Sequence, residues 1–281
     1  MAHGSRGSGE HRVRRFARAF AADPVEALLY LPEEAAKRRE HPVDYTVDED
    51  WEAHLHELLG APWPCPQADR AAELWAEVAA ELRERGLAFG RHTYGHYSDA
   101  DESLARAVRC TVLHRRAELV VETGVARGVI TRFALDAMAA ADRGRLWSVD
   151  LPHPFERELH TQTGAAVPDC LRHRWTYLEG SSRRRLPTLL RQLGQVDVFV
   201  HDSLHTARNT GFEMAAVAEV LAPGGVMLID DISTHQAFAP WTRSPAADTL
   251  VCPHADRQGL FGVVRAETRV RAVRAESCRA A

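Results

Sequence analysis

The chain reads LVVETGVARG over residues 119–128 and continues into a segment with apolar residues at helical spacing. The short apolar run that leads to Glu122-Thr123-Gly124 predicts a buried strand that ends in a turn. Gly128 then opens a helix, and because glycine lacks a Cβ atom, the backbone of such a turn can approach a ligand closely. A tight turn without a ligand has the same local pattern, so the loop alone leaves both interpretations open.

A carboxylate follows the next predicted strand, residues 146–149. Asp150 comes about 20 residues after the last glycine of the loop, where a carboxylate can accept hydrogen bonds from two ribose hydroxyls. An acidic residue after a strand is also a common turn residue. Together with the glycine loop, however, Asp150 favours a nucleoside ligand.

The residues of the loop indicate which kind of nucleoside. The loop has the form Gly-x-x-x-Gly with Ala126 in the middle, and Glu122 stands at its start. An acid at this place would repel a pyrophosphate, which argues against NAD. A cationic sulfonium ligand suits the loop better.

Over roughly residues 116–267 the chain resembles class I S-adenosylmethionine (SAM) dependent methyltransferases. The resemblance rests on Glu122-x-Gly124-x-x-x-Gly128, Asp150, Gly180-Ser181 and the run LAPGGV at residues 221–226. It implies that Glu122, Gly124 and Gly128 lie along the methionine part of SAM. It also implies that Asp150 holds the ribose and that Gly180 and Ser181 flank the adenine. Ala126 departs from the pattern, because many members have a glycine there.

The pattern of apolar residues after Arg116 predicts the fold. Short apolar runs alternate with helical stretches, which is typical of a parallel sheet covered on both faces. The expected fold class is α/β, a Rossmann-like doubly wound sheet of seven strands with a C-terminal antiparallel hairpin, plus an N-terminal helical extension. The expected strands are residues 119–121, 146–149, 175–178, 196–200 and 226–229, with the hairpin formed by residues 250–251 and 260–264.

Helix patterns and proline-rich or glycine-rich breaks predict the remaining organisation. Met214, Val217 and Leu221 predict one buried helical stripe, which Pro223-Gly224-Gly225 would stop. We expect a disordered tail over residues 1–12, a helical extension over 13–110, the methyltransferase domain over 111–270, and a second tail over 271–281.

Three carboxylates follow the fourth and fifth predicted strands: Asp202, Asp230 and Asp231. Ligands of open α/β sheets bind outside the carboxyl ends of the strands, so these acids should converge beside the cofactor loop. Their mutual repulsion calls for protons or a cation, and an all-oxygen set favours Mg²⁺, with Mn²⁺ or Ca²⁺ as alternatives. Ordinary strand-end turns and helix N-caps would give the same residues.

The spacing of these acids resembles metal-dependent O-methyltransferases of the catechol type and of the macrocin and mycinamicin type. The resemblance implies that Asp202, Asp230 and Asp231 bind the metal, and that the metal chelates two neighbouring substrate hydroxyls. It also implies a catalytic role for Asp202 and for His205, which lies three residues further on and would act as general base. A surface or helix-capping histidine is the alternative for His205.

Composition limits the partners. The formal net charge of −4 gives no basic footprint for nucleic acid, and no segment has the length of a membrane span. The five cysteines are odd in number and scattered, without the paired spacing of a zinc site or a redox motif, so a cytoplasmic location fits them. The expected partner is a small hydroxylated acceptor, and the formation of a homo-oligomer is left open.

Two further segments allow more than one interpretation. The loop of residues 92–97, with Phe238 and Trp241, could close over the site and offer apolar surface to the acceptor, or these aromatics could simply pack. Arg183-Arg184-Arg185 could bind an acidic acceptor, although such a run is usually a solvated face.

The leading function is SAM-dependent methylation of a hydroxyl on a small polyhydroxylated molecule, such as a sugar or natural product, with Mg²⁺. The alternatives are a cephalosporin-hydroxylase-like enzyme on the same fold and a non-catalytic SAM-binding module.

Overall fold

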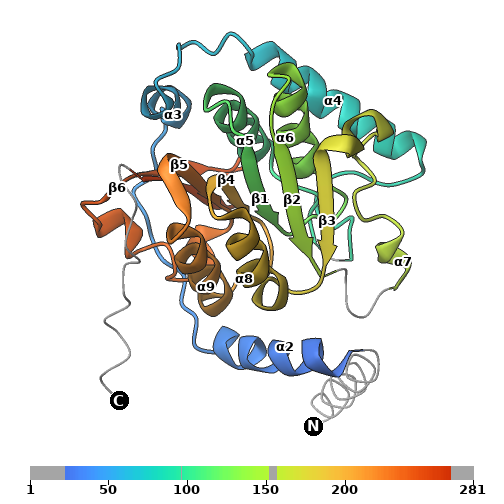
Figure 1. Cartoon of the computed structure of the whole chain (residues 1–281), viewed down its shortest axis with the longest axis vertical. Coiled ribbons are helices and arrows are strands. Elements are labelled where there is room, and N and C mark those ends of the chain that lie inside the picture. The colour runs from blue at the N-terminus through green and yellow to red at the C-terminus, as the bar shows by residue number, and fades with distance from the viewer. Residues whose placement is uncertain (1–22, 96, 152–156, 267–281) are drawn as a thin grey trace, which may run out of the picture.

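A seven-stranded sheet forms the centre of the protein in the computed structural model, which describes residues 23–95, 97–151 and 157–266. The strand order is β3-β2-β1-β4-β5-β7-β6 (Figure 1). Strands β1 to β5 pair in parallel, whereas β7 runs antiparallel to β5 and to β6. The strands are β1 (Leu119–Thr123), β2 (Arg145–Asp150), β3 (Trp175–Glu179), β4 (Val196–His201), β5 (Leu221–Ile229), β6 (Ala247–Pro253) and β7 (Leu260–Ala266). The predicted doubly wound sheet and its C-terminal hairpin are thus confirmed.

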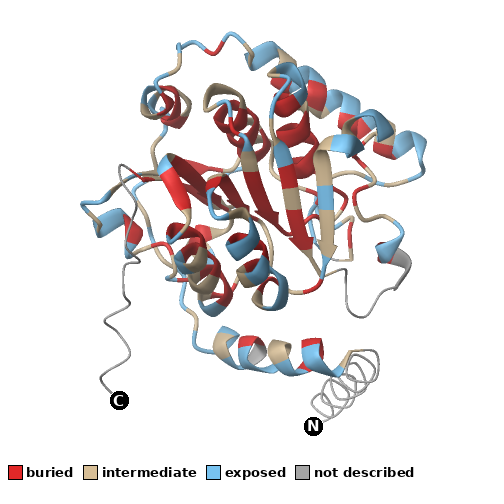
Figure 2. Cartoon of the chain, in the orientation of Figure 1, coloured by how far each residue is buried: buried red, intermediate tan, exposed pale blue. Residues whose placement is uncertain are grey.

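Helices cover both faces of the sheet, and the central strands β1 and β4 are largely buried on both sides, whereas β3 at the edge is partly exposed (Figure 2). Val120 of β1 points to a core shared with α3, α4, α5 and α6, whereas the next residue, Val121, points to a core shared with α8 and α9. This alternation follows from the two-residue period of a strand. The first face carries α3 (Trp51–Leu59), α4 (Ala68–Glu84), α5 (Glu102–His114) and α6 (Val129–Ala140), and the second carries α8 (Ser182–Leu193) and α9 (Ala207–Ala218).

The N-terminal helix α2 (Pro24–Lys37) lies against the α8 and α9 side (Figure 1). It begins at Asp23, whose Oδ1 accepts hydrogen bonds from the backbone N–H groups of Val25 and Glu26 at 3.0 and 3.1 Å. Such a cap satisfies N–H groups that have no partner within the helix. The remaining short elements are α7 (Arg157–His160), η1 (Asp169–Arg174), η2 (Ile232–Thr234) and η3 (Trp241–Arg243).

The boundary between α9 and β5 differs from the prediction. The helix ends at Ala218, and Leu221 already pairs with Val196 as the first residue of β5. The Pro-Gly-Gly segment lies within β5, where the register shifts between Val196 and Val198. A bulge of this kind accommodates the extra residues, so the segment does not stop the helix.

The helical extension and the sheet share one core. Position 110, the expected domain boundary, falls inside α5, whose Leu104 and Val108 are buried with Val120 of β1. The domain limits remain a prediction, and both expected tails lie outside the described residues. Within the described residues, no helix is long and apolar enough to cross a bilayer.

Candidate active site

The glycine loop connects β1 to α6 at the carboxyl edge of the sheet. Gly124, Ala126 and Gly128 all have positive φ, at 84°, 46° and 79°. A Cβ atom on Gly124 would overlap the carbonyl oxygen of Asp202, so only glycine allows this loop to approach the end of β4 so closely. Ala126 takes the left-handed conformation in spite of its Cβ, at a cost of roughly 1–2 kcal/mol.

Glu122, the first acid of the loop, points into the core and is 1% exposed. Its Oε2 accepts hydrogen bonds from Thr131 Oγ1 at 2.8 Å and from Ser148 Oγ at 2.6 Å. Burial raises the pKa of Glu122 to about 8, although the two hydroxyls lower it. Within the described residues, its Oε1 is buried without a hydrogen-bond partner, so one carboxyl oxygen remains available to a donor.

Asp150 lies at the end of β2, directly beside the loop. Burial raises the pKa of Asp150 to about 6, while hydrogen bonds from the backbone N–H groups of Val125, Leu151 and Ala126 lower it. Its carbonyl oxygen accepts a hydrogen bond from Gly180 N at 2.8 Å, which brings the end of β3 alongside. The structure therefore places five of the predicted cofactor residues, Gly124, Gly128, Asp150, Gly180 and Ser181, around this edge, with Glu122 beneath the loop.

The three predicted metal ligands lie at the ends of β4 and β5. Asp202, Asp230 and His205 have ligand atoms within 4.8 Å of one another. The His205 Nε2 atom is 3.6 Å from Asp202 Oδ1 and 3.9 Å from Asp231 Oδ2. Asp231 has a φ of 53°, a left-handed conformation that is uncommon for a residue other than glycine and that occurs preferentially at functional sites.

Burial and the charges within the cluster shift the pKa values of its side chains. Burial raises the pKa of Asp202 to about 6, against the hydrogen bond with His205, which lowers it. Burial also raises the pKa of Asp231. Burial alone would lower the pKa of His205, but the surrounding carboxylates, first of all Asp202, raise it to about 9. The cluster thus holds several negative charges that a cation would stabilise.

Sequence reasoning missed His254, which follows β6. Its Nε2 lies 2.8 Å from Asp230 Oδ1, and together with Asp230 and Asp231 it forms a second group of ligand atoms within 4.8 Å. Burial would raise the pKa of Asp230, but the hydrogen bond and charge of His254, the charge of His205 and the backbone N–H of Asp231 together outweigh burial, and the net shift is downward. Only the pairing of β7 with β5 brings His254 to this edge, so no local sequence motif marks it.

A buried polar network supports the end of β4 from below. Glu213 of α9 accepts hydrogen bonds from Thr123 Oγ1 at 2.5 Å and Ser203 Oγ at 2.9 Å, and its Oε2 lies 2.7 Å from His201 Nδ1. Burial would raise the pKa of Glu213, but His201 and the hydroxyls lower it to about 2. Because Ser203 is next to Asp202, this network fixes the loop that carries Asp202.

The donor set fits a divalent cation. The three carboxylates supply oxygen ligands of the kind that Mg²⁺ and Mn²⁺ prefer. His254, hydrogen-bonded to Asp230, has the arrangement of a partner that orients a ligating carboxylate.

The interpretation in which Phe238 and Trp241 offer apolar surface to an acceptor was wrong. Phe238 and Trp241 are 0% and 5% exposed and belong to the core between the sheet and α9, where a Cβ on Gly262 would clash with the ring of Phe238. They therefore offer no surface to an acceptor. Their apolar character reflects packing, the other interpretation that the sequence allowed.

The loop before α5 does lie beside the cofactor loop. Arg127 donates to Thr93 O at 2.6 Å and forms a buried ion pair with Asp99 at 3.0 Å, and its guanidinium lies over the ring of Tyr94. His96, in the middle of this segment, lies outside the described residues. The arginine of the glycine loop thus anchors the segment that was expected to cover the site.

Part of the chain matches a known protein family. Residues 121–232 match the family described as a methyltransferase domain. No curated protein sequence matches the chain. The matched range contains the glycine loop, Asp150 and all three carboxylates at the ends of β4 and β5.

Three solved structures are similar to the chain. The O-methyltransferase TomG from Streptomyces achromogenes, involved in tomaymycin synthesis and solved with SAM, is 15% identical over 69% of this chain and 89% of that chain, with a TM-score of 0.52. A proposed O-methyltransferase from Klebsiella pneumoniae is 15% identical over 78% and 97%, with a TM-score of 0.51. An O-methyltransferase from Bacillus cereus in complex with SAH is 12% identical over 77% and 97%, with a TM-score of 0.50. At such identities these structures establish the fold.

The sheet with its antiparallel hairpin gives the chain the fold of the class I SAM-dependent methyltransferases. Residues 121–232 within this fold match a methyltransferase domain.

Proposed function

We propose that the protein is a SAM-dependent O-methyltransferase that uses a divalent cation, Mg²⁺ being the best suited, and acts on a hydroxyl of a small polyhydroxylated molecule. One observation carries this proposal: Asp202, Asp230 and Asp231 gather at the ends of β4 and β5, in contact with the glycine loop through Gly124. A cofactor and a cation-bound acceptor would therefore be neighbours.

The cofactor would lie across the ends of β1, β2 and β3. The carboxylate of Asp150 is placed to accept hydrogen bonds from the ribose hydroxyls, in exchange for the backbone N–H groups that it binds here. Gly180 and Ser181 would flank the adenine, and the backbone of the glycine loop would lie along the methionine part. The similar structures with bound SAM and SAH support this choice of cofactor.

The acceptor would lie over the ends of β4 and β5. Asp202, Asp230 and Asp231 would hold the cation, which when bound lowers the pKa of a coordinated hydroxyl and orients the acceptor. Once a cation balances the charges of these three carboxylates, which raise the pKa of His205, that pKa would fall and the ring would be neutral. His205, within 4 Å of Asp202 and Asp231, would then take the hydroxyl proton. The acceptor oxygen then forms a bond to the methyl carbon, and the carbon–sulfur bond breaks with its electron pair left on sulfur, which yields S-adenosylhomocysteine.

The match to a methyltransferase domain favours this function over a cephalosporin-hydroxylase-like reaction and over a non-catalytic module.

Two substitutions separate the two halves of the site. Asp150→Ala should weaken SAM binding at least tenfold in calorimetry, because two ribose hydroxyls lose their acceptor. Asp202→Ala should leave SAM affinity within about threefold, yet lower S-adenosylhomocysteine release at least a hundredfold in an assay with Mg²⁺ and a panel of catechol and glycoside acceptors. Asp248→Ala, at an exposed acid of β6, serves as control.

Chelation tests the metal separately. EDTA should abolish methyl transfer, and added Mg²⁺ should restore it. Methyl transfer that persists in EDTA would refute the cation requirement, and equal loss of SAM binding and turnover in both variants would refute the division of the site.

A further inference from the structure

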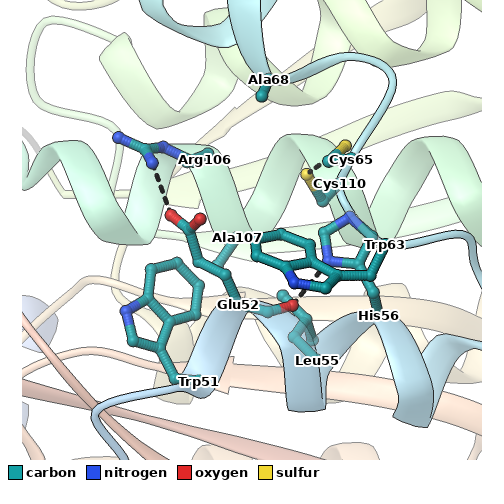
Figure 3. Close-up of a pocket in the computed structure, with 10 residues that line it drawn as sticks. All are labelled: Trp51, Glu52, Leu55, His56, Trp63, Cys65, Ala68, Arg106, Ala107 and Cys110. Carbon is teal, nitrogen blue, oxygen red and sulfur yellow. Dashed lines mark hydrogen bonds and ion pairs between the residues drawn. The ribbon is translucent and has the colours of Figure 1, made fainter.

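A second cluster of potential metal ligands lies away from the active site, between α3 and α5. Figure 3 draws His56, Cys65 and Cys110 of this cluster. His56 comes from α3, Cys65 from the connector between α3 and α4, and Cys110 and His114 from α5. Cys110 and His114 are four residues apart, so they share one face of their helix. All four ligand atoms lie within 4.8 Å of one another.

The spacing of these atoms matches tetrahedral coordination. The two sulfur atoms of Cys65 and Cys110 are 3.8 Å apart, and Cys65 Sγ is 3.7 Å from His114 Nε2. Zinc bonds of about 2.3 Å to sulfur and 2.0–2.1 Å to nitrogen at tetrahedral angles require separations of about 3.8 and 3.6 Å. The sulfur separation is far longer than the roughly 2.05 Å of a disulfide bond.

The orientation of His56 is an independent indication of a ligand. Its Nδ1 lies 2.6 Å from the carbonyl oxygen of Glu52, one turn earlier in α3, so the proton of the neutral ring resides on Nδ1. Its Nε2 is buried and, among the described residues, has no hydrogen-bond partner. A metal-binding histidine commonly donates its other nitrogen to a backbone carbonyl in this way. The His56 ring is 2% exposed, so its free lone pair does not face bulk water.

The surroundings close the cluster. Cys65 and Cys110 are 9% and 3% exposed, and the Trp63 ring lies 5.0 Å from that of His56, measured between centroids. Figure 3 shows the Trp63 and His56 rings together beside the two sulfurs. Four protein ligands leave no open position, which is the arrangement of a structural rather than a catalytic zinc ion.

We propose that His56, Cys65, Cys110 and His114 bind a structural Zn²⁺ ion. The ion would fasten α3 and the connector to α5, the helix that packs on α6 and beneath the sheet. The sequence did not predict this zinc site, because the scattered cysteines have no paired spacing. The Cys110-x-x-x-His114 pair on one helix was the only local signal, and the other two ligands come from a different segment.

Metal analysis of the full-length protein tests this proposal. Protein purified without an affinity metal from zinc-supplemented cells should contain about one zinc ion per chain after dialysis against EDTA. Cys110→Ser should lower this content at least tenfold. The exposed Cys170→Ser should leave it unchanged, and so should Asp202→Asn, which removes a ligand of the carboxylate site.

Cobalt substitution provides a readout that does not depend on a variant that folds. Wild-type protein loaded with Co²⁺ should show thiolate-to-cobalt charge transfer and the strong visible bands of tetrahedral coordination. The proposal is overturned by a wild-type protein without zinc and without these bands, by zinc retained in Cys110→Ser, or by a Cys65–Cys110 disulfide in non-reducing mass spectrometry.

Discussion

Glu122 shows how a single buried residue can make the stability of this protein depend on pH. Its carboxyl is surrounded by the core and bound by two hydroxyls, and burial raises its pKa from an ordinary 4.5 to about 8. In the unfolded chain the group ionises at its ordinary pKa. The folded state is therefore penalised increasingly as pH rises from about 4.5 to about 8, by on the order of a few kcal/mol.

Glu122→Gln removes this penalty and keeps an acceptor oxygen for Thr131 and Ser148. We expect the variant to gain stability relative to the wild type as pH rises from 5 to 8, and to differ little near pH 4.5. Denaturant unfolding at several pH values, without cofactor, measures this difference. Glu84→Gln, on an exposed position of α4, is the control. A difference between Glu122→Gln and wild type that does not vary with pH would contradict the account.

At the scale of elements, acidic side chains of α2 and of the segment after it accept hydrogen bonds at the N-termini of α8 and α9. Glu26 Oε1 accepts a hydrogen bond from Ser181 N at 3.1 Å, and Glu40 Oε1 accepts one from Ala207 N at 2.7 Å. Between them, Glu33 accepts from Thr206 Oγ1 at 2.6 Å. Glu26 and Glu33, seven residues apart, lie on one side of α2, and Glu40 lies in the segment after the helix. The partial positive charge of a helix N-terminus favours acids at these places.

The arginine run at residues 183–185 takes part in the same contact. Arg183 donates to Glu33 at 2.8 Å and Arg184 to Asp23 at 3.0 Å, whereas Arg185 binds the carbonyl oxygen of Glu179. Arg183 and Arg184 therefore hold α2 against α8. This role differs from both interpretations of the sequence, which were binding of an acidic acceptor and a solvated face.

Glu33→Ala should loosen α2, because the carboxylate is 2% exposed and its loss leaves Arg183 and Arg208 without their buried partner. Amide hydrogen exchange in residues 24–37 should accelerate about tenfold or more, while exchange in β1 stays unchanged. Leu28→Ala, on the outward face of the same helix and 56% exposed in the parent, is the matched control. Unchanged exchange in Glu33→Ala would show that packing alone holds α2.

The elements also show what could be predicted from sequence. The five parallel strands were predictable because each apolar run is short and ends near a turn residue, and β1, β4 and most of β5 are buried on both faces. The convergence of the acids after β4 and β5 was also predictable, because neighbouring parallel strands end at the same edge of a sheet. His254 and the zinc ligands were not predictable, because the antiparallel hairpin and the packing of α3 on α5 bring them together from distant segments.

At the scale of the whole molecule, the two candidate sites occupy different places in one fold. The strand order changes direction between β1 and β4, so the crevice that this creates opens at the carboxyl edge. The cofactor residues lie on one side of this point and the carboxylate cluster on the other. The zinc cluster lies instead among the helices of one face, in a core that joins Leu55 of α3 to Val120 of β1. The N-terminal segment thus supports the sheet that carries the chemistry.

The most direct measurement is a crystal structure with S-adenosylhomocysteine and Mn²⁺, the latter located by anomalous scattering. We predict ribose hydroxyls on the carboxylate of Asp150 and a manganese peak coordinated by Asp202, Asp230 and Asp231, next to the cofactor sulfur. Cofactor bound away from the loop at residues 124–128, or no manganese among these three carboxylates, would contradict the proposed site.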